Sequence, residues 1–300
     1  MANPSISGLL QKLEIPGHVA IGNGNGGLPR INITSNGSTA EIYPHGAHIT
    51  GFQKNGEPPL LFLSRSSRFA ADQPIRGGVP VCFPWFGPRA GDVMHGFARL
   101  TEWKLDETAV APGGAVTLRF HLPESAWVNA DWPAANANFV VTVADTLTME
   151  LNVTNPSKED FTFEACLHTY FAVGDVAKIS ITGLKGVHYL DKTDNLARKL
   201  EYGDAIQISS EVDRVFPNAI GAVEIRDPSL RRAIQIEKTG SASTVVWNPW
   251  MAKAKSMADF GDDEFKRMVC VESGNVAENK ITLAHGAAAT LKVVLRSRPV

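Results

Sequence analysis

Short runs in which hydrophobic and polar residues alternate recur along most of the chain, as in 138–144 (NFVVTVA), 147–155 (LTMELNVTN) and 289–297 (ATLKVVLRS). Gly, Asn, Asp and Pro residues separate many of these runs. A period of two places apolar side chains on one face of a β-strand, and turn residues between such runs are typical of antiparallel sheets. The pattern therefore predicts a large all-β protein.

Helical periodicity is scarce, and we expect only short helices at 7–14 (SGLLQKLE), 124–131 (ESAWVNAD) and 253–260 (KAKSMADF). The absence of a repeat of fixed period argues against a propeller. No segment is long and flexible enough to separate two cores. We expect a single domain over residues 1–300, built as a sandwich of two extensive antiparallel sheets.

The composition is that of an ordinary globular protein, with 300 residues of which 44% are hydrophobic and 20% charged. The 29 basic and 31 acidic residues give a net charge of −2 and form no basic block, so we expect neither a nucleic-acid nor a membrane partner. The first residues, 1–17, lack the charged and apolar regions of an export signal, and no run reaches the roughly 18 apolar residues of a membrane span. We expect a cytoplasmic protein.

The three cysteines, Cys82, Cys166 and Cys270, all lie in apolar runs. Their odd number and irregular spacing argue against a disulfide framework or a structural zinc site. We expect reduced, buried thiols, because free cysteine is among the residues most often buried.

Two apolar runs contain an ionisable side chain: 163–171 (FEACLHTYF) contains His168, and 268–275 (MVCVESGN) contains Glu272. On a strand, His168 shares one face with Glu164, Cys166 and Tyr170. Glu272 ends its run, so we expect it at the end of a sheet. Burying either charge is costly without a partner, so these residues are candidates for a functional site. The alternative is a hydrogen-bonded core histidine and a solvated glutamate.

A third segment, 73–103, concentrates cationic, histidine and aromatic side chains. They are Arg76, Arg89, His95, Arg99, Phe83, Trp85 and Phe86. Aromatic faces pack on the C–H faces of sugars, and guanidinium groups bind phosphate through paired hydrogen bonds. The segment therefore suits a sugar phosphate, although an aromatic core with surface arginines would have the same composition.

Together these motifs resemble the glucose-6-phosphate 1-epimerases (hexose-6-phosphate mutarotases) of the aldose 1-epimerase superfamily, over about residues 30–297. The motifs occur in the order IRGGVPVCFPWFGP, HGFAR, LHTYF, DRVF, WNPW and MVCVESGN. The resemblance implies an all-β, galactose mutarotase-like β-supersandwich with an open cleft on one sheet. It also implies interconversion of the α and β anomers of a hexose 6-phosphate, glucose 6-phosphate first among them, without metal or organic cofactor. Separately from the resemblance, we expect a monomer.

The resemblance also implies roles for individual residues. His168 would be the general acid at the ring oxygen and Glu272 the general base at the anomeric hydroxyl. The substrate contacts that it implies are Arg76, His95, Arg99, Asp213 and Trp247. We expect rigid strand positions to fix the reacting geometry and the cleft to keep His168 and Glu272 from full burial. One departure is Met94, where members of the family often carry Gln before HGFAR, so the choice of hexose stays open.

Three alternatives remain at this point. A non-catalytic carbohydrate-binding or regulatory protein could keep the fold, but it would have no need of a matched acid and base. A cysteine hydrolase built on Cys166 or Cys270 lacks a setting that stabilises a thiolate. A metal enzyme using His95, His168 and Glu272 lacks supporting HxH or HxD spacing.

Overall fold

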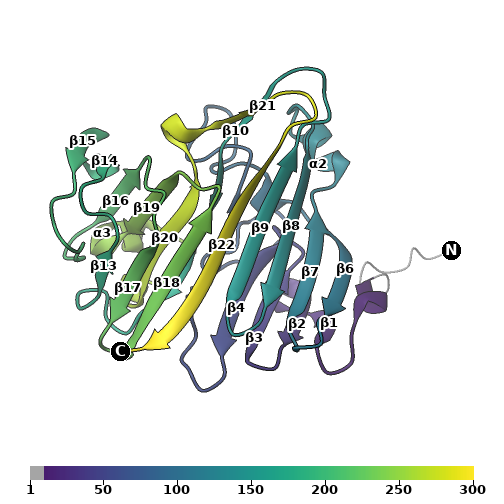
Figure 1. The fold of residues 1–300 in the computed structure, drawn as a ribbon, viewed down its shortest axis with the longest axis horizontal. Helices are drawn as coiled ribbons and strands as arrows, with labels where there is room; N and C mark the ends of the chain where they lie inside the picture. The colour runs from purple at the N-terminus through teal and green to yellow at the C-terminus, as the bar shows by residue number, and fades with distance from the viewer. Residues whose placement is uncertain (1–9) are drawn as a thin grey trace.

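The structure, a computed structural model, describes residues 10–300. Eight antiparallel strands form a sheet that we call the outer sheet (Figure 1). In spatial order they are β13 (Ser180–Thr182), β17 (Val223–Asp227), β18 (Arg232–Thr239), β22 (Ala288–Pro299), β9 (Leu147–Thr154), β8 (Asn136–Val143), β7 (Val116–His121) and β6 (Lys104–Val110). Every second residue of β8 and β9 is buried, as the alternating pattern predicted.

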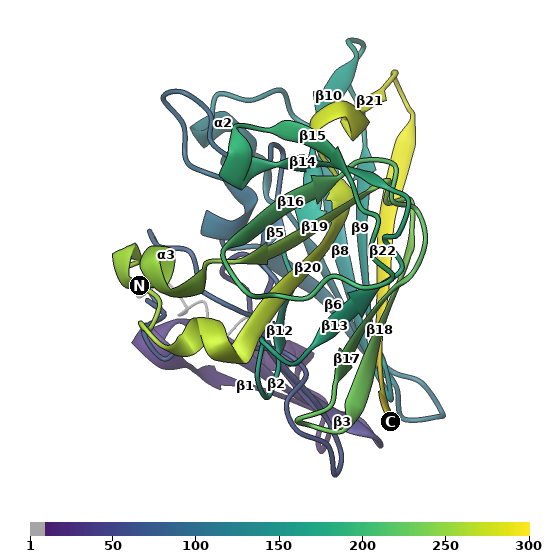
Figure 2. The ribbon, with the colours of Figure 1, turned by 90° about the vertical axis from the view of Figure 1, so that its left-hand side faces the viewer.

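A second sheet of eight strands, which we call the site sheet, lies on the other side of the core. Along its main path it contains β15 (Ala197–Leu200), β14 (His188–Asp191), β16 (Val212–Phe216), β19 (Ser243–Asn248), β20 (Met268–Asn275), β11 (Ala165–Leu167) and β5 (Val81–Cys82). Off this path, β12 (Tyr170–Ala172) also pairs with β20. Figure 2 looks onto β14, β16, β19 and β20, with β18 and β22 of the outer sheet at the right of the view.

The central strands of the site sheet are buried on both faces, since every residue of β19 and β20 is buried. Val246 and Val271 belong to the main hydrophobic core, together with Phe139 and Leu151 of the outer sheet. The opposite face of the site sheet packs in two smaller clusters, which include Cys166, Val245, Trp247 and Cys270. A strand buried on both faces has no reason to alternate, which explains the continuous apolar runs of the sequence.

Two smaller sheets complete the fold. The first four strands form consecutive hairpins: β1 (Val19–Asn23), β2 (Pro29–Thr34), β3 (Ser38–Tyr43) and β4 (His48–Lys54). The other pair is β10 (Phe161–Phe163) with β21 (Ile281–Leu283). The prediction of a large antiparallel all-β fold is confirmed.

Helices are few and short in residues 10–300. They are α2 (Glu124–Asn129), α3 (Trp250–Ser256), and the 3-10 turns η1 (Gln11–Leu13), η2 (Asn25–Gly27), η3 (Ala98–Leu100), η4 (Lys192–Asp194), η5 (Glu264–Arg267) and η6 (Ala277–Asn279). The prediction for 124–131 is confirmed. The helix expected at 253–260 begins three residues earlier, and the one expected at 7–14 lies partly outside the described residues. In the described chain, no helix has the length and apolar character to cross a membrane.

Candidate active site

His168 and Glu272 face each other across neighbouring strands of the site sheet. β11 and β12 both pair with β20, and the register is the same on either side of the two-residue gap between them. The flanking pairs are Leu167–Ser273 and Tyr170–Cys270. Continuing that register through the gap places His168 opposite Glu272, and opposed residues project to the same face of a sheet. The His168 Nε2 atom lies 3.3 Å from the Glu272 Oε1 atom.

Three expectations about this pair are wrong. β20 continues to Asn275, so Glu272 lies well inside a central strand and not at the end of a sheet. The pair is also buried, with Glu272 1% and His168 8% exposed. Sequence analysis placed His168 within a strand, whereas it lies in the gap between β11 and β12. The gap frees His168 from regular pairing while the strands on both sides fix its position.

The register brings two further predicted residues to the same face. Asp213 of β16 pairs with Trp247 of β19, which in turn pairs with Cys270 of β20. The Trp247 and His168 rings lie edge to face with their centroids 6.0 Å apart. Asp213 lies farther along the row, its side chain 15% exposed. An aromatic ring and a carboxylate therefore flank the acid–base pair, as a sugar site requires.

Arg76 connects to His168 through Tyr170. Its Nη1 atom donates a hydrogen bond of 3.0 Å to the Tyr170 hydroxyl, and its guanidinium group forms an ion pair of 3.1 Å with Asp259. The Tyr170 ring stacks on the His168 ring at a centroid distance of 4.8 Å and an interplanar angle of 14°. Arg76 is thus only one aromatic ring away from the imidazole.

Arg99 lies near both His168 and the Arg76 cluster, since its charge acts on His168 and the charges of Arg76 and Asp259 act on it. It is 9% exposed, and its Nη2 atom donates a hydrogen bond of 2.7 Å to the Met94 carbonyl oxygen. Its buried Nε atom has no hydrogen-bond partner, and none of the ion pairs of the described chain includes Arg99. Because a buried cation without a counter-ion is costly, this guanidinium group is suited to an incoming anion.

His95 is held by the short loop that precedes it. Its Nδ1 atom accepts a hydrogen bond of 3.1 Å from the Gly87 amide, which leaves the neutral ring with its proton on Nε2. The His95 and His168 rings are 5.6 Å apart and nearly perpendicular. Gly96 has a φ of 75°, and a Cβ atom there would lie 2.0 Å from the Phe83 carbonyl oxygen. This explains why the HGFAR motif needs glycine after the histidine.

Sequence analysis missed the roles of three residues. Lys192 places its Nζ atom 3.4 Å from Asp213 Oδ1 and 5.1 Å from the centre of the Phe86 ring. Cys166 donates a thiol hydrogen bond of 3.6 Å to Glu272 Oε2. Asp259 pairs with Arg76, as described above. Lys192 begins the 3-10 turn η4, and Asp259 lies in the turn after α3, within the segment 253–260 that was predicted as a helix. No motif marks either residue, so only the fold brings them to the site.

The electrostatics of the site disfavour both charged forms of the pair. Burial raises the pKa of the Glu272 carboxyl well above its usual value, against the opposing charge of Lys192. Burial also holds the pKa of His168 well below its usual value, and His95, Arg76 and Arg99 lower it further. The pKa of His95 falls to about 3, chiefly through burial. The pair is therefore poised to hold one proton between an imidazole and a carboxylate.

The cysteines do not resemble nucleophiles. All three are free and buried, as predicted. Burial raises the pKa of the Cys166 and Cys270 thiols well above the usual value, so neither forms a thiolate readily. The described residues contain one cluster with the donor atoms for a metal, namely His168, Cys270 and Glu272. It differs from the set weighed from the sequence, because Cys270 takes the place of His95.

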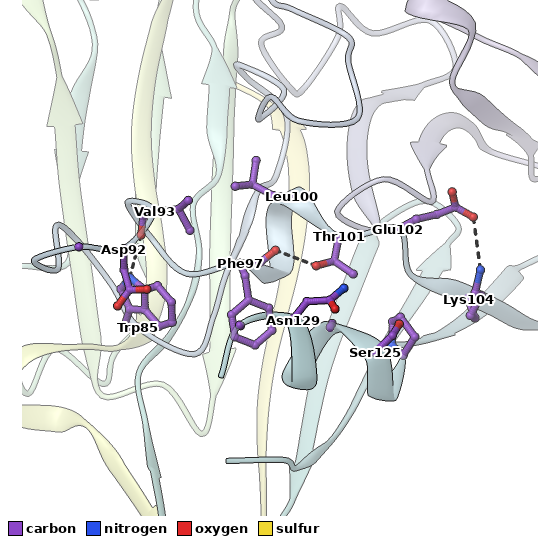
Figure 3. A pocket seen from close by; sticks show the side chains of 14 residues that line it. Trp85, Asp92, Val93, Phe97, Leu100, Thr101, Glu102, Lys104, Ser125 and Asn129 are labelled. Atoms are coloured by element: carbon purple, nitrogen blue, oxygen red, sulfur yellow. Dashed lines mark hydrogen bonds and ion pairs between the residues drawn. The ribbon is translucent and has the colours of Figure 1, made fainter. Parts of the chain in front are cut away.

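The cavity in Figure 3 is separate from this constellation. It has a volume of about 630 Å³ and is lined by Trp85, Val93, Phe97 and Asn129 among others, but by neither His168 nor Glu272. Its walls come from α2 and from residues on either side of His95 in the chain, such as Val93 and Phe97. It therefore adds no group to the acid–base pair.

Comparison with known proteins agrees with this geometry. The family model described as aldose 1-epimerase matches residues 29–296. A protein of Cenchrus ciliaris named "Putative glucose-6-phosphate 1-epimerase" is 36% identical over 270 residues, which cover 87% of this chain and 82% of the relative.

Solved structures show the same architecture. A crystal structure described as a "putative mutarotase" from Salmonella typhimurium has a TM-score of 0.88 and 28% identity, with 96% of each chain covered. A galactose mutarotase-like protein from Clostridium acetobutylicum has a TM-score of 0.67, 14% identity and coverage of 94% and 98%, and it supports the fold alone. The motifs, the match over most of the length and the shared architecture agree: this chain belongs to the aldose 1-epimerase family.

Proposed function

We propose that this enzyme interconverts the α and β anomers of a hexose 6-phosphate, with glucose 6-phosphate as the substrate. The observation that carries the proposal is the buried His168–Glu272 pair flanked by Arg99, a cation without a counter-ion. The acid–base pair suits ring opening, and the free guanidinium group suits a phosphate. The name of the relative from Cenchrus ciliaris supports the same substrate.

The reaction follows from the positions of the two groups. Glu272 removes the proton from the anomeric hydroxyl while protonated His168 delivers a proton to the ring oxygen, so the C1–O5 bond breaks and a carbonyl forms. Rotation about the C1–C2 bond exposes the other face of the carbonyl, and the two groups exchange roles during closure. General acid–base catalysis of this kind typically contributes about 10² to 10⁴ in rate for each group.

The remaining residues would bind and orient the sugar. We assign the phosphate to Arg76 and Arg99, a neutral Nε2–H donor to His95, and the ring and hydroxyl contacts to Trp247 and Asp213. Orientation converts a bimolecular encounter into a reaction within the complex, which is a large part of catalysis. We further propose that a single domain does this, since one hydrophobic cluster extends through both large sheets, and that the enzyme is a cytoplasmic monomer.

Saturation-transfer NMR on the anomeric protons of glucose 6-phosphate, galactose 6-phosphate and free glucose tests the proposal, because it reports anomer exchange directly. We expect the fastest catalysed exchange with glucose 6-phosphate. Tight binding without catalysed exchange would instead identify a carbohydrate-binding protein on the same fold.

The two arginines provide the matched test of phosphate recognition. Loss of one charge-assisted hydrogen-bond partner costs about 1.5–3 kcal/mol, or roughly ten- to hundredfold in kcat/KM. We expect Arg76→Ala and Arg99→Ala each to lower kcat/KM for glucose 6-phosphate by that factor and to affect free glucose far less. Equal losses on both substrates would show that the arginines hold the sugar or the fold.

A further inference from the structure

Positive charge surrounds the proposed general acid more closely than it surrounds the base. Arg76 reaches His168 through the stacked Tyr170 ring, and the charges of both Arg76 and Arg99 act on His168. The described residues supply one carboxylate to these two guanidinium groups, that of Asp259 on Arg76. The cluster therefore keeps an unbalanced positive charge beside an imidazole that has to carry a proton in order to act as an acid.

The proposed base, Glu272, is influenced by different charged residues than His168. The electrostatic influences on Glu272 come from Lys192 and Asp213, whereas Arg76 and Arg99 act on His168. The buried Nδ1 atom of His168 has no hydrogen-bond partner, so no carboxylate on that side of the ring stabilises an imidazolium. In the free enzyme, the pair is thus biased away from the form with protonated His168 and ionised Glu272, which is the form that opens the ring.

A phosphate dianion bound to the arginines would remove this bias. It would supply the missing negative charge near His168, on which both arginines act, whereas the charges that act on Glu272 are those of Lys192 and Asp213. Neutralising a charge a few ångströms from an ionisable group changes its ionisation by about ten- to hundredfold. The same substrate group would then both bind the enzyme and change the protonation of its acid.

We propose that the phosphate of the substrate activates the chemical step, because it neutralises Arg76 and Arg99 and so allows His168 to hold the proton that it gives to the ring oxygen. The inference rests on the proposed function. The proton balance is closed: His168 loses one proton to O5, Glu272 gains one from O1, and ring closure returns both. No oxidant, reductant or further reactant takes part.

The groups that face His168 come from several elements, and all of them belong to the electrostatic argument. They are Arg76 and Arg99, His95, Tyr170, Glu272 and Cys270, with Asp259 on Arg76 and with Lys192, Asp213 and Cys166 on Glu272. Among them, Arg76 and Arg99 are the groups assigned to the phosphate, so we expect phosphate binding to change the net charge chiefly at these two arginines.

The experiment supplies the sugar and the anion of the substrate as two separate molecules, free glucose and phosphite dianion. Anomer exchange of free glucose is measured at saturation, near pH 8, with and without phosphite dianion, and kcat for glucose 6-phosphate is measured in parallel. We expect phosphite to raise kcat for glucose about tenfold or more, with saturation. Phosphite that has no effect, or that only competes with the sugar, would overturn the activation while fast exchange of glucose 6-phosphate still upheld the proposed function. Absence of exchange with glucose 6-phosphate would overturn the function itself.

A variant without the Arg99 charge should change the two activities in opposite directions, lowering the activity on glucose 6-phosphate and raising that on free glucose. Arg99→Met should lower kcat/KM for glucose 6-phosphate, abolish most of the phosphite effect and raise kcat for free glucose a fewfold, because His168 loses a neighbouring cation. Unchanged or lower kcat for glucose in a folded variant would contradict the activation. Arg119→Met is the control, since Arg119 lies on the outer sheet and pairs with Glu107, and it should change none of these values.

The pH profile provides a second readout that does not depend on phosphite binding. If the phosphate favours protonated His168, the alkaline limb of kcat lies at higher pH with glucose 6-phosphate than with free glucose. The second ionisation of a phosphate ester, near pH 6, affects the acid limb and leaves the alkaline limb clear. Identical alkaline limbs for both substrates would overturn the proposal.

Discussion

The two large sheets have the same number of strands but differ in how their residues are buried and how their strands are paired. The outer sheet contains long strands, such as β8, β9 and β22, and in β8 and β9 burial alternates from residue to residue. The central strands β19 and β20 of the site sheet are buried throughout, and the sheet is interrupted where His168 lies between β11 and β12. We interpret the regular pairing of the outer sheet as a source of stability, and the interrupted pairing and buried ionisable groups of the site sheet as features that chemistry requires. These features lower stability, and the rest of the fold offsets that loss.

The sharpest way to test this division is to remove the acid and the base. His168→Asn and Glu272→Gln keep the shape of each side chain but remove its acid–base function, so we expect each to lower the anomer exchange rate by at least about two orders of magnitude. Circular dichroism should show an intact fold. Saturation-transfer NMR on glucose 6-phosphate measures the rate, and near-normal turnover of either variant would show that its assigned role is wrong.

The difference between the sheets also decided what the sequence could predict. Alternation in residues such as Phe139, Val141 and Met149 predicted the outer sheet, because one face of each strand packs on the core. In β20 both faces are buried, so the sequence has no period and does not reveal where the strand ends. This is why Glu272 was expected at the end of a sheet when it lies well within one.

The candidate site was predicted through motifs, and only in part. Six motifs each contributed at least one residue to the candidate site, but no pattern indicates that Asp213, Trp247 and Cys270 share a row. That row depends on strand order, which is a property of the whole chain. Lys192 and Asp259 were missed for the same reason, since Lys192 reaches the site from η4 and Asp259 from the turn after α3.

A smaller effect is expected where the site sheet meets solvent, at Lys192. Its cation opposes the rise in the pKa of Glu272, so Lys192→Met should raise that pKa further and leave more of the carboxyl protonated at a given pH. The acid limb of kcat/KM should therefore move to higher pH, with a loss of up to about tenfold below neutrality. The pH profile on glucose 6-phosphate measures the shift.

The controls for Lys192 separate charge from shape. Lys192→Arg keeps the cation and should keep the acid limb near its original position. Lys185→Met removes an exposed cation that pairs with Asp204 and should leave the profile unchanged. If Lys192→Met lowers kcat/KM equally at every pH, Lys192 only binds or positions the sugar.

The three cysteines should show a smaller effect still, and an unequal one. Cys82, Cys166 and Cys270 should each be replaceable by Ala or Ser with activity retained, at a modest cost in stability from lost packing. Cys166→Ala should have the largest effect, a loss of a fewfold, because Cys166 alone donates a hydrogen bond to Glu272 and a thiol is a weak donor. Cys82, equally buried and opposite Cys166 across β5 and β11, is the matched control. A folded variant without any activity would instead favour a cysteine nucleophile.

The smallest effect on turnover should come from the outer sheet, where stability alone should change. Met149 is fully buried in β9, and Met149→Ala should lower the free energy of unfolding by about 2–5 kcal/mol, because it leaves a cavity in the core. Its neighbour Glu150 faces outward and pairs with Lys292 at 3.0 Å, so Glu150→Ala should cost less than about 1 kcal/mol. Urea unfolding measures both values, and exchange per mole of folded enzyme should stay within about twofold of the original in both variants, since neither residue reaches the site sheet. A loss of kcat in folded Met149→Ala enzyme would mean that the outer sheet also tunes the geometry of His168 and Glu272 through the core, and that the division between the two sheets is not one between stability and chemistry.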